Sequence, residues 1–268
     1  ELERRWKQGG FSMLGAYGDI MTDLEVNAIV VDFVHRKIRE KVKDPEIAEL
    51  LCPKDHPFGT KRLCVDTGYY ETYNRDNVAL VDIRKAPIET ITATGIKTAE
   101  AEHDFDIIVF ATGFDAMTGA ILNVDIKGRQ GASLREKWAQ GPRSYLGLMV
   151  AGFPNLFTVT GPQSPSVLAN VITAIEQHVE WICDCINHMR DRQLSHIEAK
   201  KDAEDRWVNH VIELGDTTLY PQANSWYMGA NIPGKPRVFM PYVGGCGNYR
   251  KICDEIAAEN YRGFELAS

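Results

Sequence analysis

Two adjacent cations, Lys61 and Arg62, are the first residues that suggest chemistry, because they precede a short apolar stretch, Leu63-Cys64-Val65, that predicts a strand. In extended backbone, neighbouring side chains point to opposite faces, so the two cations can serve two different anionic groups. A lysine ammonium suits a point contact to a phosphate, whereas an arginine guanidinium stays charged and presents a rigid fork of donors. A basic pair on an ordinary solvated strand edge is the plainer alternative.

Two apolar runs end in glycine turns. Ile107 to Thr112 lead into Gly113, and Leu156 to Val159 lead into Gly161-Pro162. Uninterrupted apolar runs are typical of strands buried on both faces of a parallel sheet. In open α/β sheets, ligands bind beyond the carboxyl ends of such strands. A core strand followed by a turn without function is the alternative for the first run.

The second turn leads into the most strongly periodic helix of the sequence, whose apolar residues from Val171 to Met189 recur every three to four positions. A strand, a Gly-Pro loop and a helix in this order expose backbone N–H groups that favour negative charge. His178 lies within this helix, and its interpretation is a packed or partly exposed histidine without a catalytic role.

An aromatic pair, Trp226 and Tyr227, lies in a loop rich in glycine, proline and asparagine that runs from Asn224 to Pro236. Aromatic residues on such a loop suggest a lid that folds over a flat ligand. The equally weighted alternative is that they pin the loop to the body of the protein.

The remaining patterns predict the elements that position these residues. An amphipathic helix is expected over 22–43, capped by Thr22 or Asp23, and a second short helix is expected to start at Asp44-Pro45. Strands are expected over 78–83, 88–92 and 96–98, and two helices over 198–214 and 249–261.

Composition narrows the class of protein. The 268 residues carry 44% apolar and 25% charged residues and a net charge of −7, which argues against a general nucleic-acid binder. No membrane span or signal peptide is expected, and the six cysteines match no zinc pattern, so free thiols in a cytoplasmic protein are expected. Because the chain opens without methionine and contains no GxGxxG turn, we expect it to be a piece of a longer protein.

Four separated motifs together resemble the Baeyer–Villiger monooxygenases, class B flavoprotein monooxygenases of the cyclohexanone and phenylacetone monooxygenase type. The resemblance covers essentially the whole chain, in order, and matches the C-terminal half of such enzymes. The motifs are Gly59-Thr60-Lys61-Arg62, Ala111-Thr112-Gly113-Phe114-Asp115, Gly161-Pro162-Gln163-Ser164-Pro165-Ser166 and the loop from Ser225-Trp226-Tyr227 to Gly234-Lys235-Pro236.

This resemblance implies an α/β fold, part of a Rossmann-like, three-layer flavoprotein with two dinucleotide-binding domains and a helical insertion. Residues 1–57 would be the insertion in the NADPH domain and 58–105 the C-terminal part of that domain. Residues 106–268 would be the C-terminal part of the FAD domain, with a lid loop at 222–236. The implied reaction converts ketones to esters or lactones with O2, NADPH and FAD through a C4a-peroxyflavin.

The resemblance also assigns residues by position. Arg62 matches the catalytic arginine, and Lys61 matches the lysine that approaches the NADPH 2′-phosphate. The other cofactor-binding matches are Thr112, Gly113, Asp115, Asn170, Val171 and Trp226. The substrate-pocket matches are Ser166, Val167, Leu168 and Met240, and no metal site is implied.

Two other functions stay open. A related flavin monooxygenase that oxidises nitrogen or sulfur is one, although a peroxy-anion stabiliser such as Arg62 is less needed there. A non-catalytic interaction module is the other. The expected partners are a small ketone and the N-terminal half of the same enzyme, without which this fragment is expected to be inactive. A monomer or weak oligomer is expected.

Overall fold

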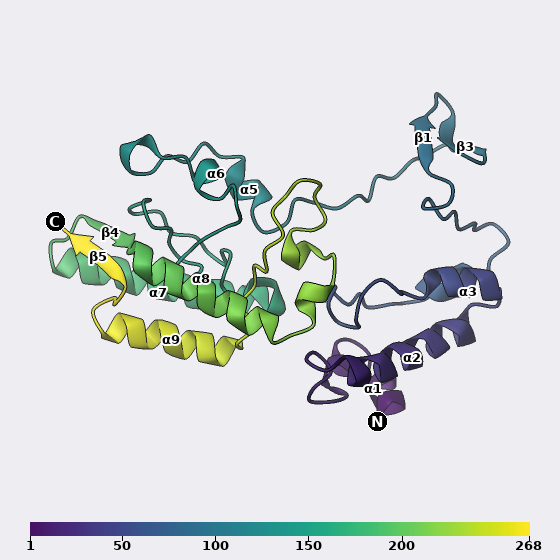
Figure 1. Ribbon diagram of the computed structural model, residues 1–268, viewed down its shortest axis with the longest axis horizontal. Coiled ribbons are helices and arrows are strands. Elements are labelled where there is room, and N and C mark those ends of the chain that lie inside the picture. The colour runs from purple at the N-terminus through teal and green to yellow at the C-terminus, as the bar shows by residue number, and fades with distance from the viewer. The chain divides into compact units, whose positions relative to one another are not determined.

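The computed structural model describes residues 1–268, which divide into two compact units, Glu1–Phe114 and Asp115–Ser268 (Figure 1). No helix of the protein combines the length and the apolar character needed to cross a membrane. The first unit contains α1 (Leu2–Gln8), η1 (Ser12–Gly15, a 3₁₀ turn), α2 (Leu24–Lys41), α3 (Pro45–Leu51), α4 (Tyr69–Thr72), β1 (Ile88–Ile91), β2 (Gly95–Thr98) and β3 (Glu102–Asp104).

Helix α2 confirms the amphipathic helix predicted over 22–43. Its N-cap is Asp23, whose carboxylate accepts from the backbone N–H groups of Glu25 and Val26 at 2.8 and 3.1 Å. Such a cap satisfies donors that have no partner within the helix. The buried side of α2 packs Val30 and Phe33 into a small core with α1 and η1. This unit therefore has apolar cores of its own.

The three strands form an antiparallel sheet in the order β1-β2-β3, with Ile91 paired to Ile96 and Gly95 paired to Asp104. At Gly95, a Cβ would lie 1.8 Å from the carbonyl oxygen of His103, so only glycine allows the strands this close. The strands predicted over 88–92 and 96–98 are confirmed. The strand predicted over 78–83 is wrong, because these residues have no ladder partner.

Two further predicted strands, 63–65 and 107–112, are absent from the structure. Residues 105–114 form an extended connection (Figure 1), and Ile107 and Val109 are each 80% exposed. The prediction of a buried strand was wrong for this chain, because a strand needs neighbours that hydrogen-bond to it and layers that cover it. Apolar sequence alone supplies neither.

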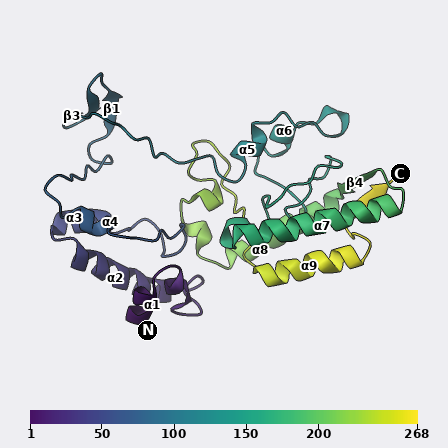
Figure 2. The same ribbon diagram turned by 180° about the vertical axis from the view of Figure 1, so that it is seen from behind.

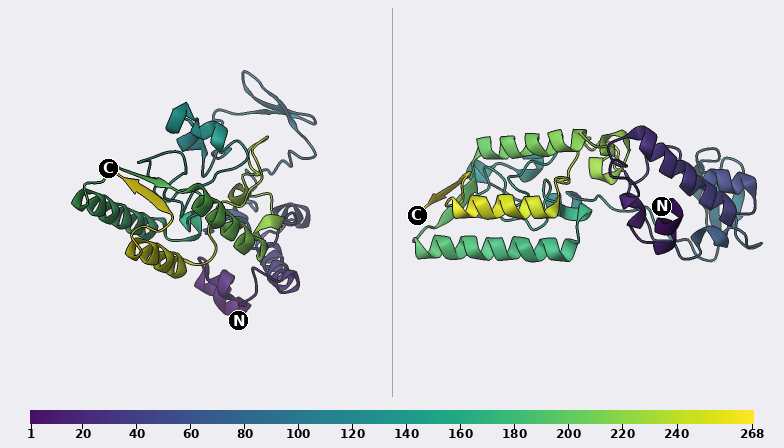
Figure 3. Two further views of the ribbon diagram at one scale, coloured as in Figure 1. Left: turned by 60° about the vertical axis from the view of Figure 1, so that its left-hand side comes forward. Right: turned by 90° about the horizontal axis from the view of Figure 1, so that it is seen from below.

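The second unit is built around three long helices. Its elements are α5 (Gly119–Leu122), η2 (Arg129–Gly131), α6 (Leu134–Lys137), η3 (Ser166–Leu168), α7 (Val171–Asp191), β4 (His196–Ala199), α8 (Lys201–Asp216), η4 (Tyr220–Gln222), η5 (Trp226–Met228), α9 (Cys246–Ala258) and β5 (Phe264–Ala267). Helices α7, α8 and α9 run alongside one another, and strands β4 and β5 lie at one end of them (Figures 2 and 3).

An aromatic core fills the space between these helices. Trp181 of α7, Trp207 of α8 and Tyr249 of α9 belong to one buried cluster. The indole N–H of Trp181 donates to the carbonyl of Cys253 in α9 at 3.0 Å, which joins two of the helices by a buried hydrogen bond. The helix predicted from the apolar spacing of 171–189 is confirmed as α7.

Three boundaries differ from the predictions in the second unit. The helix predicted over 249–261 is α9, which spans Cys246–Ala258. The strand predicted over 156–159 reduces to a single bridge between Phe157 and Met149. The helix predicted from residue 198 begins at Lys201, because His196–Ala199 pair with Phe264–Ala267 as the antiparallel strands β4 and β5. Those two strands lie more than 60 residues apart in sequence, so local periodicity does not reveal the pairing.

Candidate functional site

The two candidate cations of the first unit line one cleft of about 730 Å³. Gly59 sets the turn that leads to them: its φ is +84°, and a Cβ there would lie 2.7 Å from the side chain of Leu14. The next residue, Thr60, is fully buried and donates its hydroxyl to the carbonyl of Pro57 at 2.7 Å. Lys61 and Arg62 therefore leave a firmly anchored turn and reach an open cleft.

Arg62 is exposed and stacks on an aromatic ring. Its guanidinium carbon lies 4.6 Å from the centroid of the Phe11 ring, in the segment between α1 and η1. A planar guanidinium is attracted to the face of such a ring, which helps to orient the cation. Phe11 itself is 46% exposed, so this pair is part of the surface.

Lys61 is held by a carboxylate. Its ammonium lies 3.0 Å from Asp55, and Nδ1 of His56 lies 2.6 Å from the same carboxyl group. Hydrogen bonds from His56 and Lys61 lower the pKa of Asp55 to about 2. Asp55 is therefore anionic at any working pH, and it competes with an incoming phosphate for Lys61.

The segment around Thr112 and Gly113 lies at the end of the first unit, in exposed backbone. Gly113 has a φ of +86°, and no heavy atom lies within 4 Å of the position where a Cβ would stand. This turn is open enough for a ligand to approach the backbone. Asp115 opens the second unit, where it forms an ion pair with Lys235, whose ammonium also donates to the carbonyl of Ala116 at 2.9 Å.

The predicted pocket residues of the second unit are brought together. Val167 and Leu168 of η3 pack against a buried cluster of Tyr227, Met228 and Phe239, and Trp226 packs against the same cluster. These residues are separated by about sixty positions in sequence but form one apolar wall. The aromatic pair 226–227 and the bulge 166–168, which sequence analysis selected independently, therefore lie side by side.

Met240 joins this wall through its backbone. Its N–H donates to the carbonyl of Tyr227 at 3.0 Å, and its carbonyl accepts from the N–H of Gln163 at 2.7 Å. Its side chain is 1% exposed. Ser166 is 3% exposed and adopts a φ of +46°, and its hydroxyl lies 3.6 Å from the sulfur of Met117.

Asn170 starts α7. Its side-chain oxygen accepts from the N–H groups of Ile172 and Thr173 at 3.1 and 3.5 Å, which leaves the first helical residue, Val171, 39% exposed. The N-terminal end of a helix of this length carries partial positive charge that favours an anion.

The loop over 222–236 is pinned at its start rather than open throughout. Tyr227 is 2% exposed and its ring lies 4.3 Å from that of Trp226, measured between centroids. Trp226 is half-buried, so its outer face remains accessible. Tyr227 anchors the loop, whereas Trp226 keeps the surface that a covering residue needs.

Two buried hydroxyls beside the site lack a hydrogen-bond partner, Thr118 Oγ1 and Ser225 Oγ. Each adjoins a residue already placed in the wall, Met117 and Trp226 respectively. Buried polar atoms are nearly always paired in native proteins. Both hydroxyls lie next to the segments that form the apolar wall.

Comparison with known proteins gives a consistent answer. No family model matches the chain. It is 45% identical over 272 residues to 2-oxo-Δ3-4,5,5-trimethylcyclopentenylacetyl-CoA monooxygenase of Pseudomonas putida, with 99% of this chain and 50% of that protein covered. It is 43% identical to a Baeyer–Villiger monooxygenase of Pseudooceanicola batsensis, with 97% of this chain and 48% of that protein covered.

A third relative and a solved structure are similar to the chain over nearly its whole length as well. The phenazine N-monooxygenase PhzNO1 of Lysobacter antibioticus is 41% identical, with 100% of this chain and 49% of that protein covered. The crystal structure of OTEMO in complex with FAD and NADP matches with a TM-score of 0.95 at 45% identity, over 99% of this chain and 49% of that one. The chain has the sequence and the fold of half a Baeyer–Villiger monooxygenase. The resemblance and the α/β fold class predicted from the sequence are confirmed.

The chain spans about half the length of the curated relatives it matches. For a Baeyer–Villiger monooxygenase, the structure adds residues that sequence analysis did not select. Phe11 lies under Arg62, Lys235 holds Asp115, and Met117 contacts Ser166. Lys235 was visible inside a quoted motif, but its partner lies 120 residues away and no local pattern connects them.

His178 confirms its interpretation as a packed histidine. It is fully buried; its Nδ1 accepts from the N–H of Thr160 at 2.8 Å, and its Nε2 lies 2.9 Å from the hydroxyl of Tyr249. That hydroxyl donates to the carbonyl of Leu146 at 2.6 Å, so Nε2 must be the protonated nitrogen. Burial lowers the pKa of His178 to about 4, and the ring is neutral.

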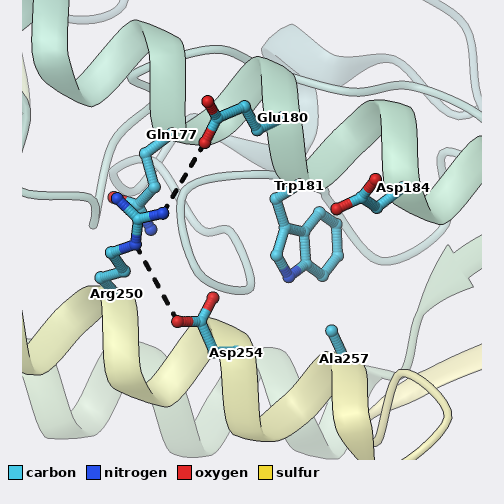
Figure 4. Close-up of a pocket in the computed structure, with 7 residues that line it drawn as sticks. All are labelled: Gln177, Glu180, Trp181, Asp184, Arg250, Asp254 and Ala257. Carbon is cyan, nitrogen blue, oxygen red and sulfur yellow. Dashed lines mark ion pairs between the residues drawn. The ribbon is translucent and has the colours of Figure 1, made fainter.

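A second hollow lies between α7 and α9 (Figure 4). Its volume is about 180 Å³, and Arg250 within it lies 3.7 Å from Glu180 and 4.0 Å from Asp254. Arg250 is already paired with Glu180 and Asp254 at the surface. None of the residues that line this hollow belongs to the wall formed by 166–168 and 226–240.

Proposed function

We propose that this chain is part of an FAD- and NADPH-dependent Baeyer–Villiger monooxygenase that converts ketones to esters or lactones with O2. The observation that carries the proposal is the position of Arg62, whose guanidinium is oriented on the Phe11 ring next to Lys61 at one cleft. The relatives support it, since one of them is a Baeyer–Villiger monooxygenase by name.

The residues present fit the two cofactors. Lys61 offers a point charge suited to the 2′-phosphate of NADPH, and the open turn at Thr112-Gly113 leaves room for a ligand near the backbone. The exposed start of α7 at Asn170 and Val171 suits a flavin ring that carries negative charge. Bound FAD, once reduced by NADPH, supplies the activation of O2.

Arg62 acts on charge that develops during the reaction. Ketone oxygenation passes through oxyanions, and a fixed cation beside them lowers the barrier because it need not reorient. One well-placed donor of this kind is typically worth about 3 kcal/mol. Phe11 contributes by restricting the guanidinium to one plane.

The substrate is a small ketone held by the wall of Ser166, Val167, Leu168 and Met240. Val167 and Leu168 are half-buried and give this wall an apolar surface, while Met240 is buried behind it. Trp226, half-buried against the same cluster, would cover the nicotinamide. Asp115, held by Lys235, fixes the segment that follows Thr112-Gly113.

The domain assignment is part of the proposal. Residues 1–57 form the helical insertion of the NADPH domain, 58–105 the C-terminal part of that domain, and 106–268 the C-terminal part of the FAD domain with the lid loop 222–236. The apolar cores around α1, α2 and α3 draw nearly all their residues from 1–57, with Phe58 and Tyr70 packed against them from the segment that follows. Six free cysteines suit a cytoplasmic location.

The main partner is the other half of the same enzyme. Exposed apolar residues in two places support this. Ile107 and Val109 are 80% exposed in the extended segment, and Ile172, Val179 and Ile186 of α7 are 65%, 44% and 47% exposed at helical spacing. Surfaces of this kind mark contacts with another polypeptide.

Oxygenation of nitrogen is the second candidate. Similarity to a phenazine N-monooxygenase at 41% identity favours it, because identity to that protein is close to identity to the ketone oxygenases. The two functions differ in the need for Arg62. Nucleophilic attack on a ketone requires the anionic oxidant that a guanidinium stabilises, whereas oxygen transfer to a nitrogen lone pair does not.

The test is a product analysis of the complete enzyme with FAD, NADPH and ¹⁸O2. Acetone, cyclopentanone and cyclohexanone are supplied in parallel with phenazine, and products are identified by mass spectrometry. We expect one labelled oxygen in an ester or lactone. Formation of a labelled N-oxide with no ester from any ketone would select the alternative. The 268-residue chain alone is expected to purify without flavin colour and without activity.

A further inference from the structure

The loop from Thr160 to Ser166 is held in an unfavourable backbone conformation. Three of its non-glycine residues lie in the left-handed region, with φ of +51° at Thr160, +66° at Gln163 and +46° at Ser166. Each such residue costs roughly 1 kcal/mol or more, and the conformation persists only where the surroundings impose it. The loop ends at the bulge that forms the pocket wall.

Gln163 is the residue through which the surroundings hold this loop. It is 1% exposed, its side-chain NH2 donates to the carbonyl of Pro142 at 2.9 Å, and its side-chain oxygen accepts from the hydroxyl of Ser144 at 2.9 Å. Its backbone carbonyl accepts from the indole of Trp207 at 3.0 Å. Side chain and backbone are therefore fixed from three directions.

The same residue links the two halves of the pocket wall. Its N–H donates to the carbonyl of Met240 at 2.7 Å, and the N–H of Tyr242 donates to the carbonyl of Ser164 at 2.8 Å. The N–H of Met240 in turn donates to Tyr227. A short ladder thus runs from the 160–166 loop through 240–242 to the turn that carries Trp226.

We propose that Gln163 is a positioning residue that sets the spacing between the 166–168 bulge and the 226–240 wall, and thereby selects which ketone carbon migrates. This inference rests on the proposed function. The residue touches no substrate itself. Its effect arises because product selection depends on small differences in orientation, and shifts near 1 Å are enough to change rates by about two orders of magnitude.

The test uses the complete enzyme with 3-methylcyclohexanone, whose two migrating carbons are chemically nearly equivalent, so that the ratio of the two lactones reports pocket shape. Gln163→Met keeps the length of the side chain and removes both hydrogen bonds of its amide group, to Pro142 and to Ser144. Gln163→Gly also removes them, and glycine adopts the φ of +66° without backbone strain. We expect both variants to change the lactone ratio at least threefold and to consume more NADPH per lactone formed.

Tyr145→Phe is the matched control. It removes one partly buried hydrogen bond, from the tyrosine hydroxyl to the carbonyl of Arg262 at 3.0 Å, which reaches none of the pocket segments. Its lactone ratio should equal that of the wild type. Flavin content and the melting curve are recorded for all variants.

The outcomes separate the two claims. If the wild-type enzyme forms no ester from any ketone, the proposed function is wrong and this inference falls with it. If the wild type forms lactones and both Gln163 variants retain its ratio, only the inference is overturned. Loss of flavin in both Gln163 variants, with Tyr145→Phe intact, would assign Gln163 a purely structural role and would also overturn it.

Discussion

The region around Lys61 and Arg62 and the region around Ser166 and Met240 are built in opposite ways. Arg62 and its ring partner Phe11 lie on an exposed surface, and Lys61 is held by Asp55, whose side chain is 67% exposed. Ser166 and Met240 are 3% and 1% exposed and belong to a hydrogen-bonded ladder. The first region offers charged groups at the surface, whereas the second is a buried wall fixed by backbone hydrogen bonds.

Substitutions in the two regions are therefore expected to differ in their effects on folding stability and on catalysis. Exposed ion pairs contribute about 0–1 kcal/mol to folding, so the first region can be altered without loss of the fold. Buried hydrogen bonds left half-made cost about 1–3 kcal/mol each, so changes in the second region affect both fold and function. Substitutions that obey or violate this division test the comparison directly.

The largest expected effect is that of Arg62→Ala on ester formation. Loss of a charge-stabilising donor worth about 3 kcal/mol predicts a fall in kcat of at least a hundredfold. Flavin content and melting temperature of the complete enzyme should stay at wild-type values, because the side chain is exposed. Product yield and flavin absorbance measure the two quantities separately.

Arg62→Lys sharpens this result, because it keeps the charge but loses the planar fork that stacks on Phe11. It should recover only part of the activity. Full retention of ester formation in Arg62→Ala would show that the exposed cation does not belong to the reaction.

The second effect concerns stability below neutral pH. His178 has its pKa lowered from 6.5 to about 4 by burial, so the unfolded protein takes up a proton between these values and the folded protein does not. Its contribution to stability is complete above pH 6.5 and is lost as the pH falls towards 4. The loss amounts to up to about 3 kcal/mol.

Melting temperatures of the wild type and His178→Gln at pH 7, 5.5 and 4.5 measure this contribution. Glutamine can accept from Thr160 and donate to Tyr249, so the variant keeps both contacts in kind and lacks the titration. The melting temperature of the wild type should fall more steeply with acidification. Parallel curves would mean that His178 does not titrate in this window.

Sequence reasoning located the helices but not the sheet neighbours, for a physical reason. Asp23 and Asn170 cap α2 and α7 through hydrogen bonds to residues two and three positions ahead. The spacing of apolar residues within each helix is also local, so both features can be read from the sequence. Strand formation at 107–112 depends on partners elsewhere, and its apolar pattern reports only what those residues would bury.

The candidate site could likewise be predicted only in part from the sequence. The 226–227 aromatics and the 166–168 bulge were found as separate motifs, while their shared cluster with Phe239 is a tertiary fact. The role of Gln163 is similarly invisible in sequence. Its contacts reach back to Pro142 and Ser144 and forward to Trp207 and Met240, and none of these spacings has a helical or strand period.

A smaller effect is expected for Lys61→Ala on coenzyme choice. Losing one ammonium–phosphate contact predicts an increase in the KM for NADPH of about tenfold, with little change for NADH, which lacks the phosphate. Asp55→Asn is the companion variant: it removes the competing carboxylate and should lower the KM for NADPH. Equal changes for both coenzymes in Lys61→Ala would place the phosphate elsewhere.

The smallest expected effect concerns the ion pair of Lys235 with Asp115. It tests whether this pair holds the 229–236 segment in place. Lys235 is 11% exposed and joins Asp115 and the carbonyl of Ala116, so Lys235→Met should release the 229–236 segment while lowering stability by only about 1 kcal/mol. Thermolysin cleavage near Ile232 should accelerate. Lys201→Met, which breaks the 2.6 Å pair with Asp205 on an exposed helix face, is the matched control and should not change that cleavage. Equal cleavage in both variants would mean that the anchor at Tyr227, and not the lysine, holds the loop.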